Sequence, residues 1–532
     1  MKSSFISELF GDLKKYWKQD STSGFLVSLI ALPLCLGIAG ASGFPPIMGV
    51  LTAIIGGMIV SILAGSPLTI KGPAAGLIVI IAGSVEELGK GDATIGWHYT
   101  AALVAVAGLG QILFGTLKLP RMVDFFPLNA VHGMLAAIGL IIISKQIHLA
   151  VGIMPAELKG KEPLDLLFLV PHSLINMESH IAVIGGLSLL ILFGWNFIPF
   201  KKIKKIPPAL VVLIFSIILG QYFHISNPEY ALRKPLVNPG ELSISWNADF
   251  SIFSQTAMLG SAFKYFVMLL LIGSLESVLT GRAIDLIDPE KRTSDLSRDL
   301  QAVGMGNTLS GFLGGLPMIA EVARSSANIA NGAKSRWANF FHGLFLLIFV
   351  VVLVPVIKMV PVAALSAMLI FVGYRLASPK LFGKVFKTGW EQLLVFVATI
   401  AVTLATDLLI GIAAGILVEL LIQLLNGVSL KSIAKSKLEL DEDSAQGVYT
   451  VRVVDSAVFS NYLKLKGLLN SIPTAKIIII DFDQARVVDH TVLENLSLFK
   501  EEYIRKGGVC TISGLEQHRS FANHPYATRV KK

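Results

Sequence analysis

Residues 66–83 read SPLTIKGPAAGLIVIIAG, and residues 314–331 read GGLPMIAEVARSSANIAN. Each stretch opens with glycine and proline, which break helices, and leaves only about ten residues for a helix, whereas a full span needs about 20. Both stretches take the third place among the apolar segments of their half of the chain. Paired short segments of this kind indicate a transporter site between two inverted repeats. The alternative is that both are ordinary kinked helices.

The composition of the whole chain indicates a membrane protein. Its 532 residues are 53% hydrophobic and 15% charged, with a mean hydropathy of +0.69, whereas about a quarter of the residues of a soluble domain are charged. We predict an α-helical polytopic protein of about fourteen spans, in two sets of seven. The spans are expected near residues 24–40, 46–64, 73–83, 98–117, 127–144, 181–198, 207–223, 260–280, 297–312, 318–331, 337–357, 361–374, 391–405 and 408–426.

Basic residues gather in alternate loops between these spans, which explains the net charge of +9 without a nucleic-acid partner. Under the positive-inside rule, this alternation puts both termini in the cytoplasm of a cell whose inner membrane holds the protein. The loop residues are Lys14, Lys15, Lys18, Lys118, Arg121, Lys201, Lys202, Lys204, Lys205, Lys291, Arg292, Arg298, Lys334, Arg336, Lys380, Lys384 and Lys387.

After the last span the composition changes to that of a small soluble domain. An acidic, polar stretch at 438–446 is followed by alternating strand-like and helix-like segments, with a fully apolar strand at 477–480. This order predicts an α/β domain in which helices cover a sheet. The expected divisions are a cytoplasmic segment at 1–23, a transmembrane domain at 24–430, a linker at 431–446 and the α/β domain at 447–532.

The starts of the two short segments are candidate anion-binding elements. A helix N-terminus has unpaired backbone N–H groups and about half a positive charge, so two facing starts can hold an anion. Small side chains at Ala74, Ala75 and Ala323 let a ligand approach the backbone. Arg324, followed by Ser325, either adds positive potential to this site or pairs with Glu321 one turn earlier; the two roles can coexist.

Two further charged residues stand in apolar surroundings. Glu276, with Thr280 one turn later, is a candidate proton carrier, sodium ligand or counter-charge, or alternatively a structural acid. Lys71 precedes the Gly72-Pro73 step. It extends to the membrane surface, pairs with Glu276 in the place of a sodium ion, or pairs with Glu321 instead.

Four motifs resemble those of the sulfate-permease (SulP) family of anion transporters. They are LPLCLGIAGASGFPP at 32–46, GPAAGL at 72–77, LES–T at 275–280 and ARSSAN at 323–328. The C-terminal part resembles the STAS domain of that family. The resemblance implies seven-plus-seven inverted repeats with core and gate domains, an anion held between spans 3 and 10, and a homodimer.

The resemblance also implies roles for single residues. Ile38, Ala74, Ala75 and Ala323 with Arg324 would line the anion site, and the Glu276 and Thr280 positions bind sodium in bicarbonate carriers of the family. This chain departs from the pattern at Lys71 and at Glu321, which puts sodium coupling in question. In the STAS-like domain, His490 replaces the hydroxyl that relatives phosphorylate, in a loop that reads Asp489-His490-Thr491.

The sequence therefore predicts a secondary transporter of a small inorganic anion, bicarbonate or sulfate, working by elevator-like alternating access in the bilayer, with sodium or proton coupling. Open alternatives are a dicarboxylate carrier of the same family, a nucleobase permease of the same fold, and a channel-like or charge-moving protein. The chain shows no catalytic constellation and no cofactor motif, so we do not expect an enzyme. No metal site is expected beyond a candidate sodium site at Glu276 and Thr280.

Overall fold

The computed structural model describes residues 2–120, 127–158, 160–200, 206–240, 245–443, 447–474 and 476–532. The chain forms two compact units, one made of residues 1–120 with 138–375 and the other of 121–137 with 376–532. Five of the basic loop residues named above, Arg121, Lys201, Lys202, Lys204 and Lys205, lie outside the described part of the chain.

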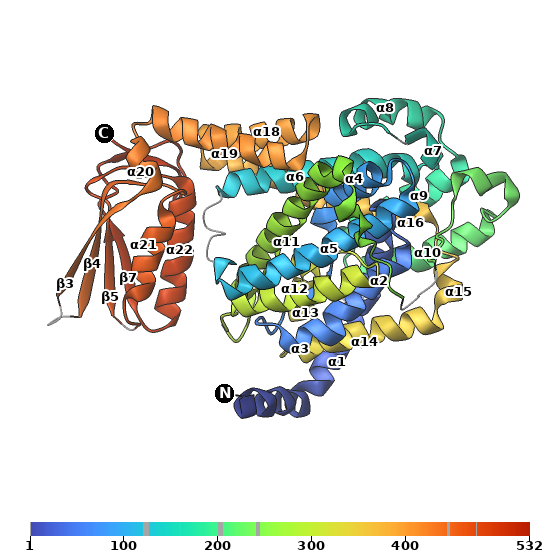
Figure 1. Cartoon of the computed structure of the whole chain (residues 1–532), viewed down its shortest axis with the longest axis horizontal. Coiled ribbons are helices and arrows are strands. Elements are labelled where there is room, and N and C mark those ends of the chain that lie inside the picture. Colours follow the sequence, from blue (N-terminus) through green and yellow to red (C-terminus); the bar gives the residue numbers. More distant parts are fainter. Residues whose placement is uncertain are drawn as a thin grey trace. The chain divides into compact units, whose positions relative to one another are not determined.

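The first unit is almost entirely helical (Figure 1). Its α-helices are α1 (Lys2–Ala41), α2 (Pro46–Ile55), α3 (Ser61–Leu63), α4 (Ile78–Gly89), α5 (Ala93–Thr116), most of α6 (Leu128–Ala150), α7 (Pro155–Leu158), α8 (Pro163–Ile175), α9 (Ser179–Gly194), α10 (Pro208–Tyr222), α11 (Leu259–Ile287), α12 (Leu296–Phe312), α13 (Val322–Ala330), α14 (Trp337–Val352), α15 (Val354–Ile357) and nearly all of α16 (Val362–Leu376). A π-helical segment, η1 (Gly56–Val60), follows α2, and short 3₁₀ turns include η2 (Ala75–Leu77).

All fourteen predicted spans coincide with helices. Among the described residues, seven helices are long and apolar enough to cross a membrane by themselves, and the bent pair α8 and α9 can serve as an eighth span. The helices α10, α14 and α18 (Trp390–Ala405) are apolar but shorter. The two interrupted stretches contain short helices, as their glycines and prolines predict, and each helix is preceded by a short strand that was not predicted.

Small residues bring the helices of the first unit close together. The helices α5 and α12 pack along one another, and so do α1 and α14. A side chain at Gly108 of α5 would overlap the backbone of Gly304 and Thr308 of α12, because its Cβ would lie far inside van der Waals contact with their atoms. Close backbone contact of this kind is how helices associate where burial of apolar surface gives little driving force.

The second unit contains membrane helices and an α/β domain. The start of α6, α17 (Pro379–Thr388), α18 and α19 (Leu408–Leu425) are followed by α20 (Leu430–Ala434), α21 (Tyr462–Ser471) and α22 (His490–Arg505). The strands are β3 (Lys437–Asp443), β4 (Val448–Ala457), β5 (Ile477–Asp481), β6 (Ala485–Val488), β7 (Val509–Ser513), β8 (His518–Ser520) and β9 (Arg529–Lys531).

The seven strands form one mixed sheet in the order β7-β5-β4-β6-β9-β8, with β3 also paired to β4. The central pairs β4–β5 and β5–β7 are parallel, which explains the apolar run of four isoleucines at 477–480 in β5. Figure 1 shows α21 and α22 lying along the sheet. The core between them is closed within the domain, with Val451, Ile478 and Ile480 packed against Leu465 and Leu496.

The segment 431–446 was predicted to be a linker, but most of it forms regular secondary structure. Residues Lys437–Asp443 form β3, which pairs antiparallel with β4 over its whole length, and α20 lies just before it. Only Leu438 of this strand packs against the core, and the other side chains are exposed. An edge strand with acidic side chains avoids pairing with other chains, and its composition therefore resembles that of a linker.

Candidate functional site

A two-stranded ribbon stands at the centre of the candidate site. The strands β1 (Ile70–Pro73) and β2 (Met318–Glu321) pair antiparallel, with Ile70 opposite Glu321 and Pro73 opposite Met318. Each strand runs directly into a helix, β1 into η2 and α4, and β2 into α13. Because the strands are antiparallel, the two helices leave the ribbon at opposite ends, and both begin at it.

Neither helix start at the ribbon is capped by a side chain. The residue before η2 is Ala74 and the residue before α13 is Glu321, and neither makes a side-chain capping hydrogen bond. Unpaired N–H groups at helix starts attract anions. Ala74 and Ala75 are buried, Ala323 is half-buried, and Ile38 of α1 is buried. The small side chains thus stand at these starts, where an anion could reach the backbone.

Arg324 is buried beside the ribbon and contacts both halves of it. Its Nη2 donates to the Pro73 carbonyl at 2.9 Å and lies 3.7 Å from the Glu321 carboxylate, while Nη1 lies 3.6 Å from the sulfur of Cys35. The Nε–H of Arg324 is buried and has no hydrogen-bond partner among the described residues. Arg324 therefore makes the expected pair with Glu321 and also keeps one unpaired donor.

Ser325 does not offer a donor to a ligand in this structure. Its hydroxyl donates to the Glu321 carbonyl at 2.5 Å and accepts the Ile70 amide at 2.9 Å. The single hydroxyl proton is thus used inside the fold. The side chain joins the first turn of α13 to β1, which fixes the ribbon on which the helix starts depend.

Glu276 of α11 faces the start of the first short helix. A Cβ on Gly76 would overlap Glu276 Oε1, so the carboxylate packs directly on the glycine backbone of η2. This side chain is only 8% exposed, and its Oε1 has no hydrogen-bond partner among the described residues. Thr280 is buried one turn later on the same helix. A buried carboxylate oxygen without a partner is costly unless a proton or cation satisfies it.

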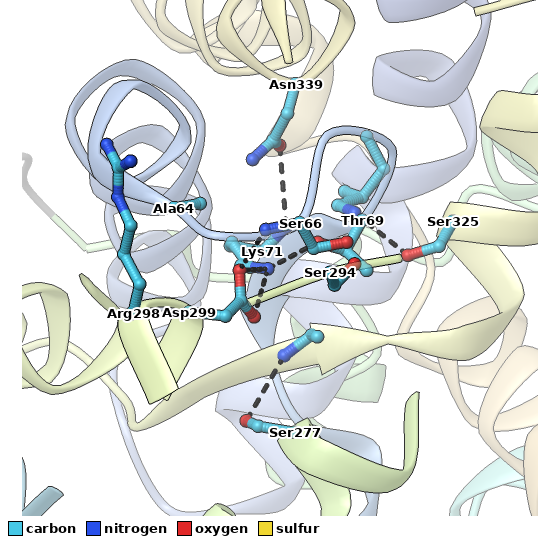
Figure 2. A network of polar contacts seen from close by, with 12 residues as sticks. Ala64, Ser66, Thr69, Lys71, Ser277, Ser294, Arg298, Asp299, Ser325 and Asn339 are labelled. Atoms are coloured by element: carbon cyan, nitrogen blue, oxygen red, sulfur yellow. Dashed lines mark hydrogen bonds and ion pairs between the residues drawn. The ribbon is translucent and has the colours of Figure 1, made fainter. Parts of the chain in front are cut away.

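Lys71 is bound to Asp299 of α12, not to Glu276. Its ammonium lies 2.9 and 2.8 Å from Asp299 Oδ1 and Oδ2, and it also donates to the hydroxyl of Thr69, as Figure 2 shows. Asp299 in turn accepts the Ser66 amide at 3.0 Å. The side chain of Lys71 is 0% exposed, so it does not extend to the membrane surface either. The predicted roles of Lys71, an extension to the membrane surface or an ion pair with Glu276 or Glu321, are therefore wrong.

Two buried asparagines that the sequence analysis did not single out also hold the ribbon. Asn307 binds both backbone groups of Met318, accepting its N–H at 2.6 Å and donating to its carbonyl at 3.0 Å. Asn339 accepts the Lys71 amide at 3.4 Å (Figure 2) and donates to the Gly56 carbonyl at 3.1 Å. Both asparagines could have been found in the sequence, because each is a polar residue inside a predicted apolar span, as Glu276 is.

The C-terminal domain places the Asp489-His490-Thr491 loop against membrane helices of its own unit. Asp489 caps α22 by accepting the Val492 amide at 2.8 Å, and it accepts the side chain of Gln423 of α19 at 3.0 Å. The Thr491 hydroxyl is buried and accepts the Leu128 amide at 3.3 Å. This loop is therefore a contact between the domain and the helices.

Comparison with known proteins decides the family. The model of the sulfate permease family matches residues 17–399, well over half of the chain. The chain belongs to the sulfate permease family. A putative sulfate transporter, YvdB of Bacillus subtilis, is 26% identical over 401 residues, which are 75% of this chain and 72% of that relative. This chain is accordingly an anion transporter and a multi-pass membrane protein, not an enzyme.

Two solved structures have a fold similar to that of this chain. The transmembrane domain of a cyanobacterial bicarbonate transporter, BicA, superposes with a TM-score of 0.64 at 22% identity, covering 75% of this chain and 97% of that one. The murine anion transporter Slc26a9 in its inward-facing state gives a TM-score of 0.66 at 14% identity, covering 95% and 88%. The second match extends over the C-terminal α/β domain, which fits a STAS-like domain.

Proposed function

We propose that this chain is a secondary transporter of a small inorganic anion, bicarbonate or sulfate, which is held between the starts of η2 and α13. The observation that carries the proposal is the pair of uncapped helix starts at the β1–β2 ribbon, with Arg324 buried beside them. Backbone N–H groups bind an oxyanion without adding a net charge to the membrane interior. Relatives named as sulfate and bicarbonate transporters support this substrate class.

Transport proceeds in this proposal by elevator-like alternating access. The ribbon, its two helix starts and the α5–α12 pair form a tightly packed group held by Asn307 and by Lys71–Asp299, so it can move as one body. The substrate would stay on this body while it passes between the two sides. Both termini lie in the cytoplasm in this proposal, because the basic loops alternate with acidic ones, and the protein acts in the inner membrane as a homodimer.

Glu276 is proposed as the group that carries the coupling ion. Its carboxylate touches the start of the anion-binding helix at Gly76, and its unpartnered Oε1 is ready to take a proton or, together with Thr280, a sodium ion. A cation there would offset the charge of the anion nearby. Lys71 is not available for this task, because Asp299 already neutralises it. We therefore also propose that anion transport is coupled to a sodium or proton gradient through Glu276.

Uptake into proteoliposomes tests this function. The purified protein is reconstituted, and entry of radiolabelled bicarbonate, sulfate, succinate and uracil is measured with and without sodium and proton gradients. The proposal predicts saturable uptake of bicarbonate or sulfate that a cation gradient drives. Uptake of succinate alone would indicate the dicarboxylate carrier, uptake of uracil alone the nucleobase permease, and ohmic anion current without saturation the channel-like alternative.

A further inference from the structure

A cavity of about 840 Å³ lies in the first unit between α1, α4, α6 and α16. Its volume is within the range of small-molecule sites in proteins. The residues assigned above to the anion site, Ala74, Ala75, Ala323 and Arg324, do not line it. It is therefore a separate space, and nothing derived so far gives it a role.

The cavity lies on the opposite face of α1 from Arg324. Leu36, Gly37 and Gly40 line the cavity, whereas Cys35 contacts Arg324 from the other side of the helix. At 3.6 residues per turn, Gly37 and Gly40 lie about 160° and 140° around the helix from Cys35, and Leu36 lies about 100° from it. Because Gly37 and Gly40 have no side chains, the backbone of α1 itself borders the cavity at these two positions.

A stripe of α4 leads from the cavity toward the first helix start. Ala82 and Glu86 of α4 line the cavity, and Ala75 lies seven residues before Ala82, in the 3₁₀ turn η2 that leads into α4. Val79 lies between them and is only half-buried, unlike its buried neighbours Ile78 and Ile80. The cavity and the first helix start are therefore about two helical turns, roughly 10 Å, apart along this segment.

The cavity is lined by an excess of positive charge. Its basic residues are Lys145, Lys161, Arg233 and Lys234, and its acidic residue is Glu86, so four positive charges less one negative leave +3. Lys161 and Lys234 are exposed, whereas Arg233 is half-buried and donates to the Gly152 carbonyl. Lys145 of α6 is half-buried, and among the described residues it makes no ion pair.

We infer that this cavity is a second anion-binding site, in which Lys145 holds a small inorganic oxyanion before the anion passes along α4 to the helix starts. An ammonium without an ion-pair partner inside a largely apolar cavity binds an anion more strongly than a solvated one does. A positive cavity also raises the local anion concentration and the rate of entry by about 10- to 1,000-fold. The inference rests on the proposed function, because it supplies that transporter with its substrate.

The test compares Lys145→Gln, Lys145→Arg and a control, Lys358→Gln. Lys358 is exposed and does not line the cavity, so its substitution makes the same change in charge outside the site. Uptake of radiolabelled bicarbonate and sulfate is measured over a range of external concentrations at low and high ionic strength. The shift of the thermal unfolding midpoint by each anion is measured in detergent for the same variants.

Lys145→Gln is expected to raise the concentration for half-maximal uptake about tenfold at low ionic strength, and less at high ionic strength, where salt screens the charge. Lys145→Arg and Lys358→Gln should stay near the unmodified protein. The inference would be overturned if the concentration for half-maximal uptake were the same in Lys145→Gln as in the unmodified protein. It would also be overturned if Lys145→Arg raised that concentration as much as Lys145→Gln does. If the unmodified protein takes up neither anion, the proposed function fails. The thermal shifts then decide alone: a smaller shift in Lys145→Gln supports the second site, and an equal shift or none overturns it.

Discussion

The ammonium of Lys71 lies 2.8 Å from one carboxylate oxygen of Asp299 and 2.9 Å from the other, and both side chains are buried. This ion pair joins β1 to the first turn of α12, next to the strand that carries the first helix start. It places a buried cation beside the ribbon without making that cation available to the substrate or to Glu276. The pair is therefore a structural element on which the geometry of the site depends.

Removing one partner of this pair is expected to be strongly destabilising. Lys71→Met and Asp299→Asn should each cost about 3–5 kcal/mol, because each leaves a buried group without its counter-charge. The double variant should cost clearly less than the sum of the two. Thermal unfolding of the purified protein measures all three variants. Lys264→Met, which breaks the more exposed pair with Glu87, should cost less than about 1 kcal/mol and serves as the control. Additive losses would show that Lys71 and Asp299 do not act together.

The two short helices at the ribbon could be predicted from the sequence, whereas the pairing of β1 with β2 and the partner of Lys71 could not. The Gly72-Pro73 step and Pro317 stop a helix by local chemistry, so the short segments could be predicted. Asp299 lies 228 positions from Lys71 and directly follows Arg298 in the first turn of α12, so no local pattern marks it as a counter-ion. The same limit applies to β3, because its exposed acidic side chains hide a strand that only pairing with β4 defines.

The C-terminal domain should fold without the membrane helices. Its core is closed by residues between Leu438 and Tyr526, so a chain ending after Asn426 and a fragment of residues 427–532 should both give soluble or detergent-stable, monodisperse protein. The shortened membrane part should unfold a few degrees lower, because the Gln423–Asp489 and Leu128–Thr491 hydrogen bonds are lost. Size-exclusion chromatography and thermal unfolding provide the measurements. Aggregation of both pieces would mean that the domain is required for the membrane part to fold.

Acid should weaken this domain through Glu494. Burial favours the neutral carboxyl, but the hydrogen bond and charge of His490, 3.1 Å away, outweigh it and lower the pKa of Glu494 to about 2. Because this folded pKa is lower than the unfolded value of about 4.5, the stabilisation is complete above that value. It should be lost as the pH falls toward 2. In the whole protein, where Lys384 also lies 3.5 Å from this carboxylate, Glu494→Gln should cost on the order of 3 kcal/mol at pH 6 and nearly nothing at pH 2. A pH-independent difference between the two proteins contradicts this assignment.

Glu276 should determine the dependence of transport on a cation gradient. Glu276→Gln keeps the size of the side chain but cannot release a proton or bind sodium as a carboxylate, so uptake should lose its response to sodium and proton gradients. Gly76→Ala should have a similar effect, because its Cβ would overlap the carboxylate of Glu276. The exposed Glu229→Gln is the matched control. Gradient-driven uptake that persists at full rate in Glu276→Gln would show that this acid is structural.

The central claim, that an anion binds at the helix starts beside Arg324, is tested most directly by the anion affinity of Arg324 variants. Arg324→Ala, Arg324→Lys and the unmodified protein are compared in proteoliposomes over a range of bicarbonate and sulfate concentrations. Unfolding curves confirm that each variant is folded, since Arg324 also binds the Pro73 carbonyl. The account predicts that Arg324→Ala raises the half-saturating concentration of the transported anion at least about tenfold, the loss expected for one buried charge at the site. Arg324→Lys should lie between the two. An unchanged half-saturating concentration in folded Arg324→Ala would contradict the account.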